Sequence, residues 1–232
     1  MQHILAFILT ILTSLSYGQN FTYPTIKQQA KEINDFVPVG WMVLDSADGD
    51  LNKDGVADVA IILQHKDSIL LTNSFNDTVL TQPRILLVLF RNAVGNTFTV
   101  AEQSNTFILK HDNPAMDDPY LEMAINKGVL EIKFHLFYNS GSWYVTNAVY
   151  KFRYQQENFV LIGADNASFH RATHDFEEYS YNFLTKKRAF TKGNDNKRIK
   201  NTTWKTVDVA PLKTLKTFGE PFTWEVEKSI FL

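Results

Sequence analysis

The sequence lacks cysteine, has little glycine and proline, and carries almost no net charge. The absence of cysteine from all 232 residues excludes disulfides, thiolate zinc sites, iron-sulfur clusters, a cysteine nucleophile and a lipid-modified N-terminal cysteine. With only 10 glycines and 7 prolines, most turns must use asparagine and aspartate. The 23 Lys+Arg and 25 Asp+Glu residues give a formal charge of -2. This charge creates no field that would attract nucleic acid, which excludes a basic groove binder.

A long apolar run is also missing, and the one short run is at the N-terminus. Residues 4–12 are uncharged and apolar, but the segment is too short to span a bilayer. Ser16 and Gly18 are small residues at the -3 and -1 positions of a cleavage site before Gln19. We therefore expect a signal peptide at residues 1–18, a secreted or periplasmic mature chain that is not a lipoprotein, and no stable membrane insertion after cleavage.

The start of the chain departs from the signal-peptide pattern in one respect. Residues 1–3 contain no Lys or Arg, so only the terminal amino group is charged. A buried N-terminal strand and an uncleaved membrane anchor therefore stay open as alternatives.

Most of the chain alternates apolar and polar residues with a period of two, which predicts strands. Apolar residues make up 44% and aromatic residues 13% of the sequence, enough for a sizeable core. Segments 59–63 and 85–90 are apolar on both faces, so we expect these two strands to be central and buried. The predicted strands are at residues 41–44, 57–63, 84–91, 97–103, 120–125, 129–138, 143–154, 159–162, 178–184 and 189–192.

Asparagine-rich connections join these strands and predict hairpins rather than parallel crossovers. Before them, residues 24–37 have apolar side chains at helical spacing between Pro24 and Pro38, which predicts one amphipathic helix. We therefore expect a mostly β protein: an antiparallel meander, propeller-like or sandwich-like, with one N-terminal helix. Residues 19–232 should form a single domain with a polar C-terminal segment.

The most specific local pattern is an acidic loop at residues 48–58. Counted from Asp50, oxygen ligands fall at alternate positions up to position 9: Asp50, Asn52, Asp54, the backbone carbonyl of Val56, and Asp58. Calcium prefers hard oxygen ligands, and alternate residues of a tight loop can direct them at one centre. Gly55 supplies the backbone freedom for the sharp turn. These residues are our candidate metal ligands, with Ca²⁺ as the cofactor.

The loop is not an EF-hand, because position 12 is Ile61 instead of glutamate and the flanking segments read as strands. The loop has the pattern D-x-N-x-D-G-x-x-D and runs directly into the apolar strand DVAIIL. This pattern resembles the FG-GAP, or VCBS-type, repeat of integrin-like propellers. The chain also resembles secreted bacterial proteins that carry this motif. The resemblance implies that the five residues above bind calcium. Such propellers have several copies of the repeat, whereas this chain has one.

Two simpler interpretations of the loop stay open. In the first, it is an asparagine- and aspartate-rich turn without metal. In the second, which we favour, calcium binds and only holds the hairpin together. Clustered carboxylates repel one another without a cation, so binding would be coupled to ordering of the loop.

Aromatic and polar side chains near the turn at residues 139–142 are candidates for a binding surface. We single out Tyr138, Trp143, Tyr144, His170 and Arg171. Exposed aromatic rings on a rigid scaffold can stack on sugars or anchor a protein, although aromatic residues are also common in cores. The expected partner is an unidentified protein or glycan.

We expect a binding or interaction module with structural calcium rather than an enzyme. Neither a G-x-S-x-G elbow nor an H-E-x-x-H motif occurs in the sequence. An extracellular hydrolase that acts on a polymer and a purely structural envelope protein are the alternatives.

Overall fold

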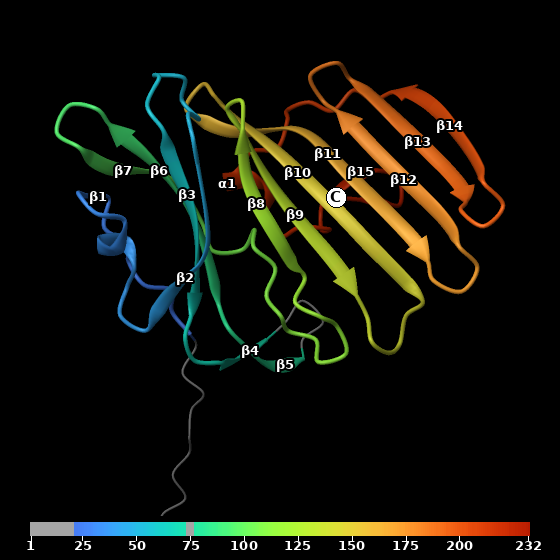
Figure 1. Cartoon of the computed structure of the whole chain (residues 1–232), viewed down its shortest axis with the longest axis horizontal. Helices are drawn as coiled ribbons and strands as arrows, with labels where there is room; N and C mark the ends of the chain where they lie inside the picture. The colour runs from blue at the N-terminus through green and yellow to red at the C-terminus, as the bar shows by residue number, and fades with distance from the viewer. Residues whose placement is uncertain (1–20, 73–76) are drawn as a thin grey trace, which may run out of the picture.

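A computed structural model describes residues 21–72 and 77–232, and the predicted signal peptide lies outside these residues (Figure 1). Two antiparallel sheets dominate the fold, which confirms the predicted mostly β, antiparallel architecture. The five-stranded sheet has the order β1 (Gln29–Ala30), β7 (Thr97–Ser104), β6 (Arg84–Asn92), β3 (Asp58–His65) and β2 (Trp41–Gly49). The seven-stranded sheet is a simple meander of β14 (Ile199–Thr206), β13 (Lys187–Asn194), β12 (Asp175–Asn182), β11 (Asn158–His170), β10 (Tyr144–Gln155), β9 (Val129–Phe137) and β8 (Tyr120–Asn126).

Short elements complete the structure. They are the 3-10 turn η1 (Ile33–Phe36), the hairpin of β4 (Ile69–Thr72) and β5 (Thr78–Thr81), the one-turn helix α1 (Leu215–Phe218), and the hairpin of β15 (Glu225–Glu227) and β16 (Ile230–Phe231). In the part of the chain that is described, no helix is long and apolar enough to cross a bilayer.

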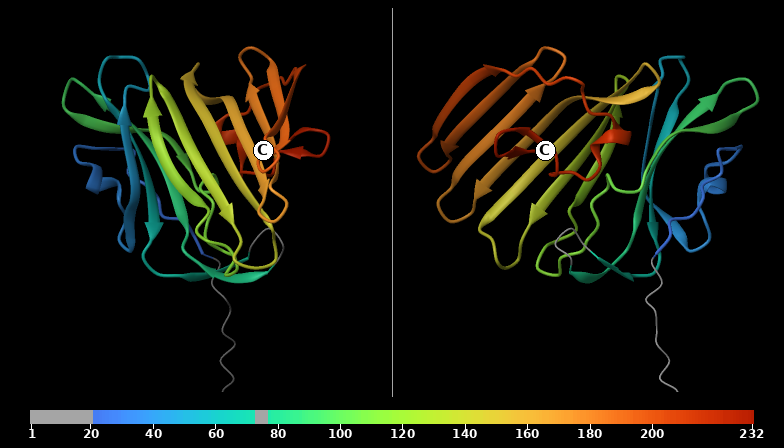
Figure 2. Two further views of the ribbon diagram at one scale, coloured as in Figure 1. Left: turned by 45° about the vertical axis from the view of Figure 1, so that its right-hand side comes forward. Right: turned by 180° about the vertical axis from the view of Figure 1, so that it is seen from behind.

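The two sheets meet along β2 and β8, and their inner faces share one core (Figure 2). Alternation along the strands decides which side chains enter it. In β3, Ala60 and Ile62 point into this shared core, whereas Ile61 and Leu63 point into a second core on the other face. The five-stranded sheet is thus covered on both faces, which explains why residues 59–63 of β3 and 85–90 of β6 are apolar on both faces.

The second core replaces the predicted helix at residues 24–37. Ile26 and Phe36 are buried there, as their apolar character requires, but the backbone is extended, with β1 and the single turn of η1. The reason is the free edge of β7. Gln29 and Ala30 pair with that edge, and the amide of Val100 donates to the carbonyl of Gln28 at 2.9 Å. These sheet hydrogen bonds compete with the internal bonds of a helix.

The seven-stranded sheet is covered on its inner face only. Buried side chains of the shared core lie on this face, together with α1 and the C-terminal hairpin. The segment predicted to be polar therefore has two parts: β14 is exposed along its whole length, whereas Leu215, Phe218 and Leu232 are buried. The opposite face of the sheet, called the outer face below, is turned to the viewer in Figure 1. Strand alternation places mostly polar side chains on it, among them Glu131, Lys133 and Lys151.

One charged pair is built into the end of the shared core. The guanidinium of Arg84 donates to the carbonyl of Leu109 at 2.7 Å, to the Gln64 side chain at 2.9 Å and to both carboxylate oxygens of Asp118. The Arg84 side chain is 2% exposed, whereas that of Asp118 is 45% exposed. Burial alone would raise the pKa of Asp118, but the hydrogen bonds and positive charge of Arg84 hold it below its usual range.

We predict that Asp118→Asn lowers the free energy of unfolding by about 1–3 kcal/mol at neutral pH, because the buried guanidinium of Arg84 loses its partly exposed carboxylate partner. Since the pKa of Asp118 is lowered in the fold, its stabilisation is present above the unfolded-chain pKa of about 3.9 and disappears as pH falls through the folded value. Urea denaturation at neutral and acidic pH measures both effects.

The matched control is Asp208→Asn, which removes an ion pair between Lys186 and Asp208 whose side chains are 56% and 69% exposed. Exposed pairs contribute about 0–1 kcal/mol. If both variants lost equal stability at neutral pH, the buried pair would have no special role.

Candidate functional site

The acidic loop joins β2 to β3, and Asp58 is its most buried acidic residue. Asp58 is 0% exposed at the first position of β3. Its Oδ2 accepts hydrogen bonds from the backbone amides of Leu51 at 2.9 Å and Asn52 at 3.3 Å, and its Oδ1 accepts one from Arg91 at 3.0 Å. One carboxylate therefore connects the loop, β3 and β6.

The side chains of Asp50 and Asp54 accept hydrogen bonds from backbone amides of the same loop and so stabilise its turn. Asp50 accepts from the amides of Lys53 at 2.6 Å, Asp54 at 3.2 Å and Gly55 at 3.0 Å. Asp54 accepts from the amide of Val56 at 2.8 Å. Lys53 and Gly55 have φ angles of 67° and 84°, in the left-handed region that glycine adopts most easily. The predicted sharp turn at Gly55 is thus present.

The loop also attaches the five-stranded sheet to the seven-stranded one. Leu51 is 0% exposed and belongs to the shared core. On the flanks, a Cβ atom added to Gly49 would lie 2.5 Å from Cγ2 of Ile125, and one added to Gly128 would lie 3.3 Å from the carbonyl oxygen of Asp50. These glycines permit the close approach of the loop to the β8–β9 hairpin.

The oxygen atoms of this loop are the type of ligand that a hard cation such as calcium prefers. An ionised carboxylate has about four acceptor positions. Asp50 and Asp58 each use three of them and Asp54 uses two, counted over the described residues. Burial, with a smaller contribution from the charge of Asp54, raises the pKa of Asp58, while its backbone hydrogen bonds oppose the rise. A cation would favour the ionised form.

The side chains are not drawn together as a metal cluster. Within residues 21–72 and 77–232, no three His, Cys, Asp or Glu side chains are arranged to hold a metal ion. The predicted set relies on Asn52 and the carbonyl of Val56 as well, and the amide of Asn52 donates to Asp54 Oδ2 at 3.0 Å. Calcium binding would require these groups to turn toward one centre.

The predicted aromatic surface is divided between the two faces of the seven-stranded sheet. Trp143 and Arg171 lie on the outer face, where the guanidinium of Arg171 stacks 4.6 Å from the ring centre of Phe137 and 5.7 Å from that of Trp143. Arg171 also donates to the backbone carbonyls of Tyr138 at 2.9 Å and Ser142 at 2.5 Å. It thereby fixes the turn that presents Trp143, which is 63% exposed.

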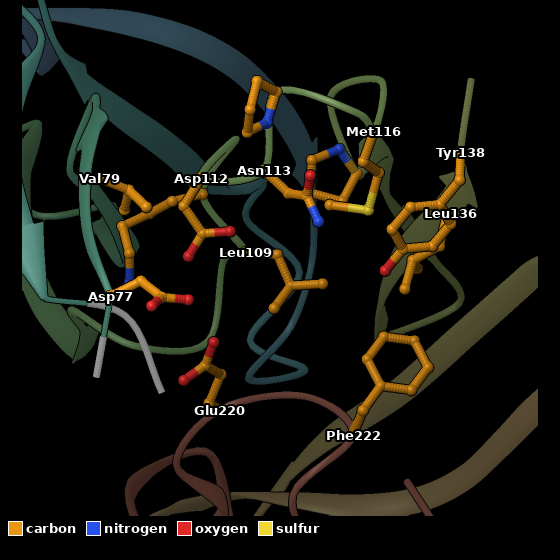
Figure 3. A pocket seen from close by; sticks show the side chains of 13 residues that line it. Asp77, Val79, Leu109, Asp112, Asn113, Met116, Leu136, Tyr138, Glu220 and Phe222 are labelled. Carbon is orange, nitrogen blue, oxygen red and sulfur yellow. The ribbon is translucent and has the colours of Figure 1, made fainter. Parts of the chain in front are cut away.

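The other three residues lie on the inner side. Tyr144 and His170 are paired across β10 and β11, and their rings meet edge to face at 4.8 Å. Tyr138 is separate from them, because its side chain lines a pocket of about 300 Å³ (Figure 3). The five residues therefore do not form one surface.

That pocket was not anticipated from the sequence. Asp77, Asp112 and Glu220 line one side of it, whereas the other side is formed by apolar and aromatic side chains (Figure 3). The apolar and aromatic set is Leu109, Met116, Leu136, Tyr138 and Phe222. The three carboxylates come from segments far apart in the chain, so no sequence spacing signals them.

No protein-family model, no curated protein and no solved structure matches this chain. Its function must therefore be argued from the site itself.

We predict that Asp58→Asn in chelator-containing buffer lowers the free energy of unfolding by about 1–2 kcal/mol. Asparagine has one acceptor oxygen, so the amides on one side of residue 58 would face an NH₂ group instead of an acceptor. Urea denaturation measures the loss.

Asp48→Asn is the control, because Asp48 is an exposed carboxylate of the neighbouring strand β2. Equal stability of the two variants would mean that the hydrogen bonds of Asp58 do not support the fold.

Proposed function

We propose that this chain is an exported calcium-binding β protein in which the ion is structural and the seven-stranded sheet serves as a binding module. The main support for calcium binding is the loop at residues 50–58. There, a fully buried Asp58 lies behind a turn that Asp50 and Asp54 stabilise. Calcium takes about six to eight oxygen ligands, and carboxylates, amides, backbone carbonyls and water all serve. The loop offers four side chains and the carbonyl of Val56.

The position of the loop supports a structural role for the ion. It carries Leu51 into the shared core and packs on the β8–β9 hairpin, far from the exposed Trp143 at the other end of β10. An ion here would stabilise the junction of the two sheets and would not contact a ligand at Trp143.

The binding role is supported by the outer face. Trp143 is held there by Arg171 instead of being packed in the core, and Trp204 on β14 is 72% exposed on the same face. Large exposed aromatic side chains on a rigid sheet are typical of recognition surfaces.

Export is supported by the sequence of residues 1–18. Mass spectrometry of the exported chain identifies its first residue directly, and we expect Gln19.

A polymer hydrolase is the alternative, and it would use the pocket of Asp77, Asp112 and Glu220, because glycoside hydrolysis needs two carboxylates in one cleft. Polysaccharide cleavage that disappears in Glu220→Gln would favour this alternative over a binding module.

We predict that calcium raises the melting temperature of chelator-treated protein by about 5–10 °C at a free concentration near 100 times Kd. Asp54→Ala should abolish the rise, because it removes a ligand near the surface while leaving Asp58 in place. Because the pKa of Asp58 is raised in the fold, ionising it costs stability as pH rises above the unfolded value, and calcium should remove that cost.

Asp48→Ala should respond like the unaltered chain, and magnesium should act more weakly because it gives up water reluctantly. Identical melting curves with calcium and with chelator would contradict a structural calcium ion.

A further inference from the structure

The outer face of the seven-stranded sheet carries a row of apolar side chains that sequence spacing does not reveal. Cross-strand register places Phe137, Val145, Phe169 and Phe176 side by side on β9, β10, β11 and β12. The row continues through Gly193 on β13 to Lys200 on β14. Trp143 and Arg171 stack at its β9 end. The row runs across the strands of a face that is otherwise mostly polar.

At the β12 end of this row the surface is hollowed by about 430 Å³. Phe169 and Phe176 line the hollow together with the end of β13 and the start of β14. Gly193 makes room for the ring of Phe176, because a Cβ atom there would lie 2.6 Å from its Cζ. The half-buried ring is therefore held against the sheet beside the hollow. The ammonium of Lys200 lies over this ring, 6.0 Å from its centre, and must turn aside before a ligand packs on the ring.

The polar lining of the hollow is balanced in charge. Two acidic residues, Glu178 and Asp195, are matched by two basic ones, Arg198 and Lys200. Glu178 and Lys200 are 3.7 Å apart in a loose pair, with side chains 46% and 63% exposed. Both can turn to a ligand at little cost. Such a lining selects neither an anion nor a cation.

Asn147 adds a planar hydrogen-bonding group on β10. Its Oδ1 is 2.7 Å from Nδ1 of His135 on β9. Within the described residues its amide nitrogen has no partner, and Asn147 lines the hollow beside Phe169. The hollow is thus lined by aromatic rings, an amide, and charged groups whose charges sum to zero. Its volume is within the usual range for small-ligand sites, about 300–1,000 Å³.

We propose that this hollow is a subsite for an uncharged carbohydrate, which deepens the binding role proposed above and rests on it. A sugar ring has a face of C–H groups that packs on an aromatic ring and an edge of hydroxyls that both donate and accept. Phe169 and Phe176 receive the C–H face. Asn147, Glu178 and Lys200 bind the hydroxyls. The apolar row leads the rest of the glycan toward Trp143.

Other occupants fit the chemistry less well. An anionic polymer would require a net positive lining, and the hollow has none. A second copy could add its β14 to the free edge of the sheet, and the sedimentation arm of the test below detects such a dimer.

The test is calorimetric titration of the mature chain with cellohexaose, xylohexaose and mannohexaose, with tetragalacturonic acid as the anionic probe. We expect at least one neutral hexasaccharide to bind and the acid not to bind. Phe176→Ala and Phe176→Leu should each weaken that binding by about tenfold or more, because leucine lacks a flat ring. Phe176→Tyr should bind like the unaltered chain.

Phe231→Ala is the matched control, since Phe231 is a 46% exposed phenylalanine on β16, behind the sheet. Melting curves verify that each variant is folded. The proposal is overturned if no neutral hexasaccharide binds, if the Phe176→Ala and Phe231→Ala variants bind equally well, or if sedimentation shows a dimer that Phe176→Ala dissociates. These failures leave the calcium-dependent melting temperature untouched, so they are distinguishable from failure of the calcium proposal.

Discussion

The buried carboxylate of Asp58 anchors the loop whose Leu51 packs into the core shared by the two sheets. It accepts amides from Leu51 and Asn52 in the loop and from Arg91 in β6. A buried charge is tolerated only with several strong donors, and here all of them come from backbone amides. Because those amides belong to separate segments, the loop cannot move without leaving a buried polar group unpaired. The side chain of Leu51 is thereby held in the shared core.

The two sheets that meet at this junction are covered to different extents. The five-stranded sheet is covered on both faces, since the N-terminal segment seals one side and the shared core seals the other. The seven-stranded sheet packs against the shared core with its inner face only, so its outer face stays uncovered within the described residues. In the proposed function, calcium at the loop would stabilise the junction of the sheets. A ligand would bind elsewhere, on the outer face, where rings such as Phe176 and Trp143 lie.

The sequence predicted the strands that alternate clearly. It placed β3 and β6 centrally because both of their faces are apolar, and it found the turn at Gly55 from its spacing. It failed where tertiary contacts override local pattern. Residues 24–37 have helical spacing, yet Gln29 and Ala30 in this segment pair with the open edge of β7 as β1. The strand β14 has no apolar alternation and forms only because β13 offers its edge.

The candidate sites divide in the same way. The loop residues are close in sequence, so the sequence alone predicts that they lie together. The sequence does not predict the apolar row on the outer face, because Phe137, Val145, Phe169 and Phe176 become neighbours only through strand register. Alternation also separates neighbours: Trp143 and Tyr144 are adjacent in sequence but lie on opposite faces of the sheet.

The central claim is that an ion at this loop stabilises the loop that Asp58 anchors, and through Leu51 the junction of the two sheets. Amide hydrogen exchange tests it most directly, read at Leu51, Asn52 and Arg91 with calcium and with chelator. The account predicts that calcium slows exchange at all three amides together, by about tenfold for each 1.4 kcal/mol of added local stability, and leaves the amides of β14 unchanged. Equal exchange rates at these three amides in calcium and in chelator would contradict it.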